Sequence, residues 1–263
     1  RVFDGSINAK WFGAVGDGIT DDTTAIQAAD AYARSIKSGV FFPDGVYLIS
    51  SLTIYSGSTW IGSGRDITVF KARTDSTQDI IYGDNTDENW GRTTGGATQF
   101  VDGCTLIGLT IDGQYAEGKT AGHGISVWGC KMVWRDLSIR NIPGRGIQTE
   151  WMDSGSMVYG MEGYFDNIRI DRTGEDGWYF NGPHDSTLNN IIVIDAGLKA
   201  NDTYDSIRAN FNGTAQWQNL HTWSRSFTGS RPRYSFHDSS NSTNILNAHF
   251  EGPRSANIML NAN

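Results

Sequence analysis

Five residues that could act as acids, bases or cations occupy similar places along the chain: His123, Arg145, Glu175, Asp176 and Asp205. Apart from Glu175, which adjoins Asp176, each lies two residues before a short segment that begins with an apolar residue. If neighbouring segments pair as strands, the carboxyls of Asp176 and Asp205 approach to about 5–6 Å, which suits the acid and nucleophile of a retaining glycosidase. The proximity of like charges would then keep one carboxyl protonated as a general acid.

The neighbours of this pair could support its chemistry. Arg145 could hold the second carboxylate ionised or bind a carboxylate of the substrate, Glu175 is a second candidate acid, and His123 is a supporting group. A polysaccharide lyase would instead need a base and a cation, roles that His123 or Tyr179 could fill together with Arg145. The run 174–177, Gly-Glu-Asp-Gly, is equally compatible with a plain turn in which the aspartate accepts backbone hydrogen bonds.

Glu150 is a rival candidate centre. It precedes Trp151 and a long insertion, residues 151–163, which contains Asp153. Insertions on solenoid proteins gather on the functional face. Glu150 and Asp153 together with Arg208 would form a separate site, because Glu150 and Asp176 are about 16 Å apart along the strand direction.

The same segments carry two columns of residues predicted to point outward, because side chains alternate faces along a strand. Amides, rings and charged groups dominate these columns, which suits the hydroxyls of a sugar chain; an ordinary solvated surface is the alternative. The first column is Ser126, Gln148, Tyr179, Arg208, Ser235 and Met259, and the second is Trp128, Glu150, Asn181, Asn210, His237 and Asn261. The candidate substrate-binding residues are Gln148, Tyr179, Asn181, Arg208, Asn210, His237, Trp128 and Trp151.

A repeated apolar signature positions these columns. The pattern Φ-x-x-Φ-x-Φ, where Φ is apolar in all but one place, occurs six times, and a second short strand follows each copy. The first members of the copies are Leu106, Trp134, Phe165, Leu188, Trp217 and Ile245, and the second strands start at Ile125, Ile147, Trp178, Ile207, Tyr234 and Ile258. A period in the twenties with short strands predicts an all-β solenoid whose repeats must stack to bury their apolar faces.

Composition and charge exclude several functions. The net charge of −8 argues against nucleic acid and against an acidic membrane surface as partners, and no segment is apolar enough to span a membrane. The two cysteines, Cys104 and Cys130, are expected to be buried thiols. Histidine spacing matches no zinc motif. The acidic segment at 83–96 is more typical of a flexible surface loop than of a calcium site. We therefore expect no metal and no cofactor.

The front of the chain predicts a cap for the solenoid. Residues 21–37 have apolar residues at helical spacing, and a strand, a turn and a strand follow at 40–49. The run Trp11-Phe12-Gly13-Ala14-Val15-Gly16-Asp17-Gly18 and its continuation to Gln27 resemble the opening of the pectate-lyase-3 group of right-handed parallel β-helices, and the F-P-x-G-x-Y pattern at 42–47 resembles that group's first coil. We expect an N-terminal cap over 1–39 and a β-helix over 40–263. The chain stops just after a strand, so we expect further sequence or a partner chain to cover the last coil.

Within this group, the segments 177–186 and 247–252 are most similar to phage tailspikes. The resemblance implies a homotrimer in a phage virion, in contact with other tail proteins, that depolymerises a host surface polysaccharide by glycoside hydrolysis. A non-catalytic receptor-binding β-helix and a polysaccharide lyase are the alternatives. In polygalacturonase-like members the catalytic aspartates precede the histidine, whereas His123 here comes before Asp176 and Arg145 stands where an acid is expected, so their mechanism does not transfer directly.

Overall fold

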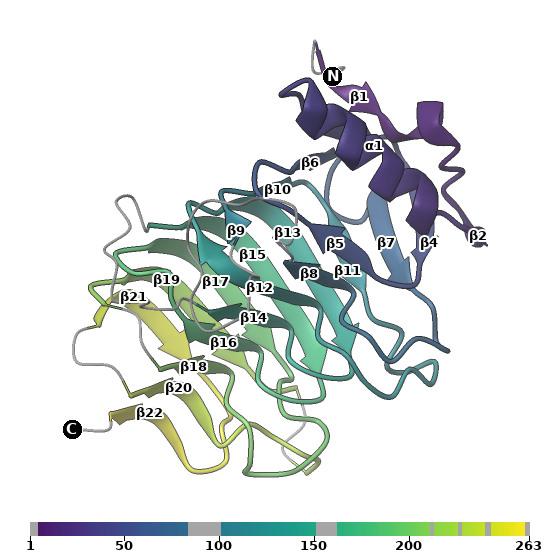
Figure 1. Ribbon diagram of the computed structural model, residues 1–263. Coiled ribbons are helices and arrows are strands. Elements are labelled where there is room, and N and C mark those ends of the chain that lie inside the picture. The colour runs from purple at the N-terminus through teal and green to yellow at the C-terminus, as the bar shows by residue number, and fades with distance from the viewer. Residues whose placement is uncertain are drawn as a thin grey trace, which may run out of the picture.

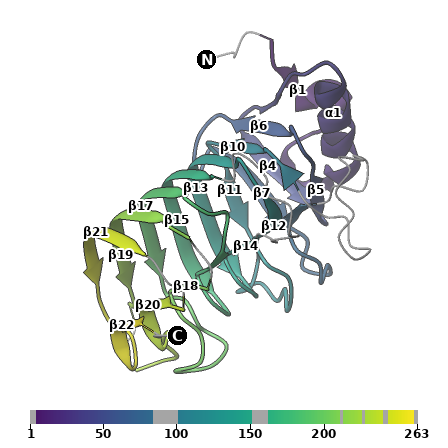
Figure 2. The ribbon, with the colours of Figure 1, turned by 60° about the vertical axis from the view of Figure 1, so that its left-hand side comes forward.

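The computed structural model describes residues 5–83, 101–150, 162–210, 213–225, 228–239 and 243–260. The chain winds into a stack of coils that advances from the N-terminal helix to the C-terminal strands (Figures 1 and 2). Within these residues the strands form a 13-stranded sheet and a 9-stranded sheet, which we call the large sheet and the small sheet. The pairs formed by the repeated strands are parallel. The molecule is therefore the parallel β-helix that the repeat predicts.

Each coil contributes strands to both sheets. The large sheet contains β1 (Ile7–Asn8), β2 (Asp17–Asp21), β3 (Val40–Phe42), β4 (Gly45–Ile49), β6 (Thr59–Gly62), β7 (Thr68–Ala72), β10 (Thr105–Ile107), β11 (Thr110–Asp112), β13 (Val133–Ile142), β15 (Tyr164–Thr173), β17 (Thr187–Ile194), β19 (Gln216–Trp223) and β21 (Asn244–Phe250). The small sheet contains β5 (Leu52–Ile54), β8 (Ile81–Gly83), β9 (Val101–Asp102), β12 (Ile125–Cys130), β14 (Ile147–Glu150), β16 (Trp178–Asn181), β18 (Ile207–Ala209), β20 (Tyr234–Asp238) and β22 (Ala256–Leu260).

The apolar signature forms the long strands of the large sheet. Its first members pair in register from coil to coil, as in Trp134 with Phe165 and Leu188 with Trp217. In a straight strand, residues three apart face opposite sides, yet Trp134 and Leu137 are both fully buried. A residue in the left-handed region, Asp136 at φ 56°, bends the strand between them. The bend turns both apolar residues inward. It therefore explains why two residues, rather than one, separate the first two apolar positions of the signature.

The interior of the coil is packed with large aromatic side chains. The rings of Phe165, Trp178 and Phe180 meet edge to face at centroid distances of 5.2–6.3 Å. Trp217 continues this contact to Phe236 in a later coil, at 5.3 Å. Each of these side chains is fully buried. Aromatic residues thus fill the core of successive coils and hold both sheets at a fixed separation.

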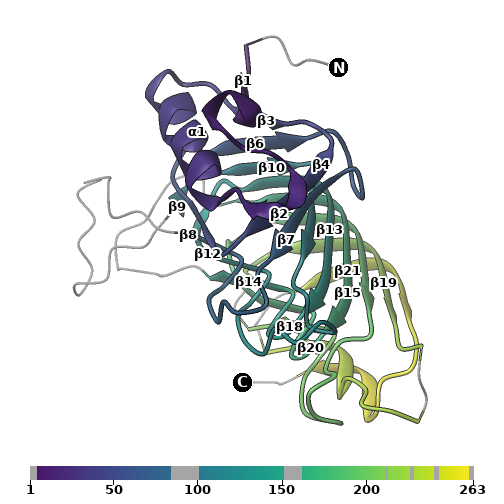
Figure 3. The same cartoon turned by 90° about the vertical axis from the view of Figure 1, so that its right-hand side faces the viewer.

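The helix α1 (Thr23–Ser35) covers the first coils, next to the short 3-10 helix η1 (Ala9–Phe12) (Figure 3). It is shorter than the 21–37 expected from the sequence, because Asp21 belongs to β2 and the chain leaves the helix at Ile36, before Lys37 at φ 55°. The Asp22 carboxylate accepts the N–H groups of Val15 and Gly16 and does not cap the helix. Ile26 and Ala29 lie on the buried face of the helix. The strand β1 precedes the helix and pairs with β3, so the front segment extends the large sheet.

Two further expectations concern the rest of the described chain. Cys104 and Cys130 are buried thiols, as predicted, and no disulfide joins them. Among the described residues, no helix has the length and apolar character needed to cross a bilayer.

Candidate active site on the outer face of the small sheet

The two outward columns exist along β12, β14, β16 and β18. Gln148 pairs with Tyr179 and Tyr179 with Arg208, while Glu150 pairs with Asn181. These side chains are half-buried, and the residues between them are fully buried. We call the outward set the polar strip: Trp128, Gln148, Glu150, Tyr179, Asn181, Arg208 and Asn210. The strip is continuous over four coils, as the sequence predicted.

The predicted register is wrong in one coil, that of β20, whereas Ile258 and Met259 of β22 line up with Ile207 and Arg208 as predicted. The sequence alignment placed Tyr234 beside Ile207 and His237 beside Asn210, but Ile207 pairs with Phe236 and Arg208 pairs with His237. A shift of two residues keeps the same side chains facing inward, so the fully buried Phe236 points into the core in either register, and the shift places it level with Ile207 and in contact with Trp217. The wholly apolar ring of Phe236, rather than Tyr234, therefore takes the inward position beside Ile207, and His237 moves into the first column.

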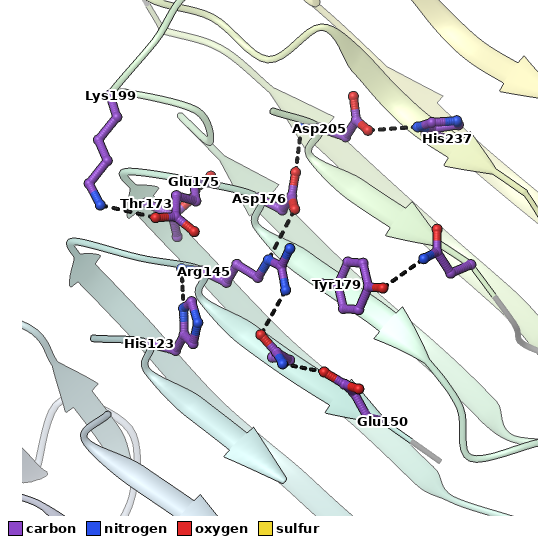
Figure 4. Close-up of polar contacts among 12 residues, drawn as sticks. His123, Arg145, Glu150, Thr173, Glu175, Asp176, Tyr179, Lys199, Asp205 and His237 are labelled. Atoms are coloured by element: carbon purple, nitrogen blue, oxygen red, sulfur yellow. Dashed lines mark hydrogen bonds and ion pairs between the residues drawn. The ribbon is translucent and has the colours of Figure 1, made fainter. Parts of the chain in front are cut away.

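Tyr179 lies at the centre of the strip. The Cζ atom of Arg145 lies 4.0 Å from the centroid of the Tyr179 ring, and that of Arg208 lies 5.9 Å from it. Asn210 donates from Nδ2 to Tyr179 Oη at 2.6 Å, and Arg145 donates from Nη1 to Gln148 Oε1 at 2.7 Å. Two guanidinium groups and two amides thus lie around one phenol on an outward surface, and Figure 4 shows the Arg145 side of this cluster.

The expected pair of aspartates is adjacent but enclosed. Asp205 donates its backbone N–H to Asp176 Oδ1 at 2.8 Å, and Asp176 Oδ2 lies 3.2 Å from Arg145 Nε. The Asp205 carboxylate accepts two hydrogen bonds from Arg233, at 3.1 and 2.9 Å, and lies 2.8 Å from His237 Nδ1. Asp176 is 2% exposed and Asp205 is fully buried. Both carboxylates therefore face protein partners rather than an open surface.

Burial governs the protonation of Asp176. Loss of water raises the pKa of this carboxyl above its ordinary value, although the Asp205 N–H and the Arg145 guanidinium oppose that rise. A raised pKa is typical of a general acid, but a carboxyl that acts on substrate must also reach it. Asp176 lies behind Arg145 and is better placed to orient that guanidinium.

The other predicted catalytic residues occupy the turn before the strip. Glu175 forms an ion pair with Lys199 at 3.0 Å. His123 Nδ1 accepts the backbone N–H of Arg145 at 2.9 Å, so this nitrogen carries no proton, and burial lowers the pKa of His123. Figure 4 shows both residues on the opposite side of Arg145 from Tyr179. Their positions suit support of the turn.

Glu150 is on the strip itself. Gln148 donates from Nε2 to Glu150 Oε1, and Glu150 is half-buried. Trp151 and Asp153, the predicted companions of Glu150, lie outside the described residues. Glu150 is thus a carboxylate that shares the outward surface with Tyr179.

Sequence reasoning missed Arg233 as a member of the site. Hydrogen bonding to Asp205 raises the pKa of Arg233, which fixes the positive charge beside that carboxylate. The available signal was the place of Arg233 in the turn that enters β20, about one repeat after the turn that holds Asp205.

Comparison with known proteins agrees with the fold. The family model of rhamnogalacturonase A/epimerase, pectate lyase-like proteins matches residues 6–251. Depolymerase 1, capsule K8-specific, of Klebsiella phage K5-4 is 24% identical over 247 residues, which cover 90% of this chain and 33% of the phage protein. Mannuronan C5-epimerase AlgE3 of Azotobacter vinelandii is 28% identical over 226 residues, covering 79% of this chain and 11% of the epimerase. The chain thus spans at most about a third of these two relatives.

Solved structures share the same coil. Tailspike protein gp49 of Acinetobacter baumannii bacteriophage Fri1, a capsular polysaccharide depolymerase, superposes with a TM-score of 0.70 at 15% identity over 99% of this chain and 48% of the tailspike. ORF18 of Geobacillus virus E2 superposes with a TM-score of 0.68 at 20% identity over 96% of this chain and 50% of that protein. At these identities the likeness establishes the fold.

Proposed function

Because this chain belongs to the rhamnogalacturonase A/epimerase, pectate lyase-like family, we propose that it binds and depolymerises a polysaccharide of a bacterial surface. The relatives named above support this proposal: one acts on a capsule, one is an epimerase of mannuronan, and the tailspike is a capsular polysaccharide depolymerase. The same likenesses support a place in a phage tail, acting at the host surface. Assembly as a homotrimer with other tail proteins belongs to this proposal as well.

The observation that carries the choice of substrate is the charge around Tyr179. Arg145 is matched by Asp176, but Arg208 forms no ion pair with a carboxylate in the part of the chain that the structure describes. The charge of Arg208 acts on Asp176 only through space, and a half-buried guanidinium without a direct ion-pair partner favours a negatively charged ligand such as a carboxylate. The strip therefore suits a glycan that contains uronic acid or another acidic sugar.

The same cluster favours cleavage by elimination. Arg208 would bind the uronate carboxylate and withdraw charge from the neighbouring carbon. A base removes the proton of that carbon, a carbon–carbon double bond forms as the adjacent glycosidic carbon–oxygen bond breaks, and an acid donates a proton to the leaving oxygen. Tyr179, whose ring lies near both guanidinium groups, is the candidate for the group that takes the carbon-bound proton as a phenolate and then donates a proton to the leaving oxygen. Elimination needs no second carboxylate, so it fits a strip in which Asp176 and Asp205 are enclosed.

Hydrolysis is the second candidate because Glu150 lies on the same surface. In this reaction Glu150 would be one of the two carboxyls that glycosidases require. The originally expected pair, Asp176 with Glu175 or Asp205, would need both carboxyls to leave their present ion-pair partners. A third possibility, a binding protein without turnover, would use the same strip and leave the polymer intact.

The test is incubation with purified acidic polysaccharides, including Klebsiella K8 capsule, alginate and polygalacturonate, with neutral dextran as control, followed by mass spectrometry. We expect products of an acidic glycan that lack the added water and absorb ultraviolet light. Tyr179→Phe should lower kcat by at least about 100-fold, whereas the matched control Tyr164→Phe, on the exposed part of β15, should retain activity.

Products heavier by one water would contradict elimination and point to hydrolysis, in which case Glu150→Gln should abolish turnover. Polymers that bind but stay intact would contradict depolymerisation altogether. Cleavage of dextran alone would contradict the acidic substrate.

A further inference from the structure

Two histidines form a stacked pair on the outer face of the large sheet, away from the polar strip. His221 on β19 pairs directly with His249 on β21. Their rings are parallel within 2°, with centroids 5.0 Å apart. This separation is close to the spacing of neighbouring strands, so the backbone register holds the two imidazoles face to face. Figure 2 shows β19 and β21 side by side at the C-terminal end of the stack.

One carboxylate oxygen lies next to both rings. Glu251 follows His249 by two residues, and its Oε1 lies 3.4 Å from His221 Nε2 and 3.3 Å from His249 Nε2. The three ligand atoms lie within 4.8 Å of one another. A tetrahedral zinc ion with bonds of about 2.0–2.1 Å separates its ligand atoms by about 3.3 Å. The two nitrogen–oxygen distances already match an edge of that tetrahedron, and a turn of the parallel rings about their Cβ–Cγ bonds would direct both Nε2 lone pairs at one ion.

Charge and accessibility agree with a cation at this place. Among the described residues, the ion-pair partners of Glu251 are these two histidines, and no lysine or arginine neutralises its carboxylate. Neutral imidazoles contribute no charge, so the cluster carries one negative charge for a divalent ion. The side chains of His249 and Glu251 are 69% and 42% exposed, which leaves a path for an ion and room for a water ligand.

We propose that His221, His249 and Glu251 bind a divalent transition metal ion, with zinc the best match, and leave its fourth position open to water. Two nitrogens and one carboxylate oxygen form a ligand set that zinc accepts in proteins. The ion would link β19 to β21 and so fasten one coil to the next. The inference does not depend on the proposed function, because it uses a different sheet and different side chains.

Local spacing could not reveal this site. His221 and His249 are 28 residues apart, so they match no short zinc motif, and the sequence led us to expect no metal. In a solenoid, one repeat length along the chain corresponds to one strand spacing in space. His221 and His249 are equivalent positions in successive repeats, and this equivalence brings them together.

The experiment measures zinc binding to the whole chain after treatment with chelator and dialysis. Isothermal titration with Zn²⁺ should give one ion per chain for the wild type and for the control Glu117→Gln, whose carboxylate lies in an exposed loop. His249→Ala and Glu251→Gln should each weaken the affinity by at least about tenfold. Zinc should also raise the Tm of the wild type and leave that of His249→Ala unchanged.

A second probe tests the geometry. Co²⁺ in the same site should give the intense visible absorption of a tetrahedral complex, and His249→Ala should lose it. Circular dichroism of the two variants establishes that they remain folded. Absence of saturable binding in the wild type, or equal affinity in wild type and both variants, would overturn the proposal. A weak spectrum of octahedral type would overturn the proposed geometry.

Discussion

The charged residues near the polar strip form two groups: those that pair with an opposite charge in the protein interior and those that face solvent. Asp176 and Asp205 are enclosed with Arg145, Arg233 and His237. Buried charges of this kind need several well-placed partners, because the free energy lost on desolvation exceeds the attraction of a single poorly aligned ion pair. Charges that carry out chemistry on a polymer must instead remain accessible. Accessibility, rather than residue type, therefore shifts the candidate chemistry from the aspartates to the surface around Tyr179.

His123 gives a prediction about pH. Burial lowers its pKa, and its Nδ1 accepts the Arg145 N–H, so the folded protein holds this ring neutral. The unfolded chain takes up a proton near pH 6.5, whereas the folded chain does so only at lower pH. The stability that neutral His123 contributes is present above that value and is lost as pH falls through the lowered folded pKa. Urea midpoints at about pH 7.5 and about pH 5 should differ more for the wild type than for His123→Asn.

The asparagine is chosen because its Oδ1 can accept the Arg145 N–H in place of Nδ1. His123→Ala is the control: it removes the acceptor and should lower the urea midpoint at both pH values. An Asn variant whose midpoint falls with acid as much as that of the wild type would show that His123 does not carry this pH dependence.

At the scale of elements, the bend in each long strand is the feature on which the fold depends. The residue at the bend is left-handed in five successive coils: Asp136, Asn167, Asn190, Asn219 and Asn247, with φ from 53° to 58°. Asparagine and aspartate tolerate this region better than other residues with a Cβ. Asn190 also donates from Nδ2 to Asn167 Oδ1 at 3.0 Å, and Asn167 donates to Asp136 at 2.6 Å. The bend thus has both a conformational and a hydrogen-bonding cause.

Asn190 separates these two causes. Asn190→Gly keeps access to positive φ and loses the side-chain hydrogen bond, whereas Asn190→Ala loses both. We expect Asn190→Ala to lower the free energy of unfolding by about 1–2 kcal/mol more than Asn190→Gly, measured by urea denaturation. Equal losses in the two variants would mean that the backbone conformation contributes little.

The repeat predicts elements better than it predicts contacts. The apolar signature located the long strands because the copies from β10 to β19 bury the same three positions. The register of β20 was mispredicted because Tyr234 and Phe236 are both aromatic and alternate correctly, and only packing against Trp217 selects Phe236. The enclosure of Asp205 could not be predicted either, since Arg233 comes from the long turn that precedes the next coil. Turns between strands have no periodic constraint, so their side chains are the least predictable part of the site.

The whole molecule is a linear stack in which each coil contacts its neighbours. Stability in such a stack is approximately a sum of local terms, and damage to one coil should spread to adjacent coils before distant ones. Trp217 is the most informative place to test this, because it contacts Trp178 and Phe180 on one side and Phe236 on the other. Its indole Nε1 also has no hydrogen-bond partner among the described residues.

Trp217→Ala should cost about 3–5 kcal/mol through lost burial and the cavity that remains. Hydrogen exchange should then lose protection first in β17, β19 and β21, while β3, β4 and β7, several coils away, keep theirs. Trp217→Phe is the matched control: it keeps an aromatic ring in the stack and removes the unpaired N–H, so its loss should be clearly smaller. Equal loss of protection in the first and last coils of Trp217→Ala would contradict local additivity, because it would mean that the solenoid unfolds as one cooperative unit.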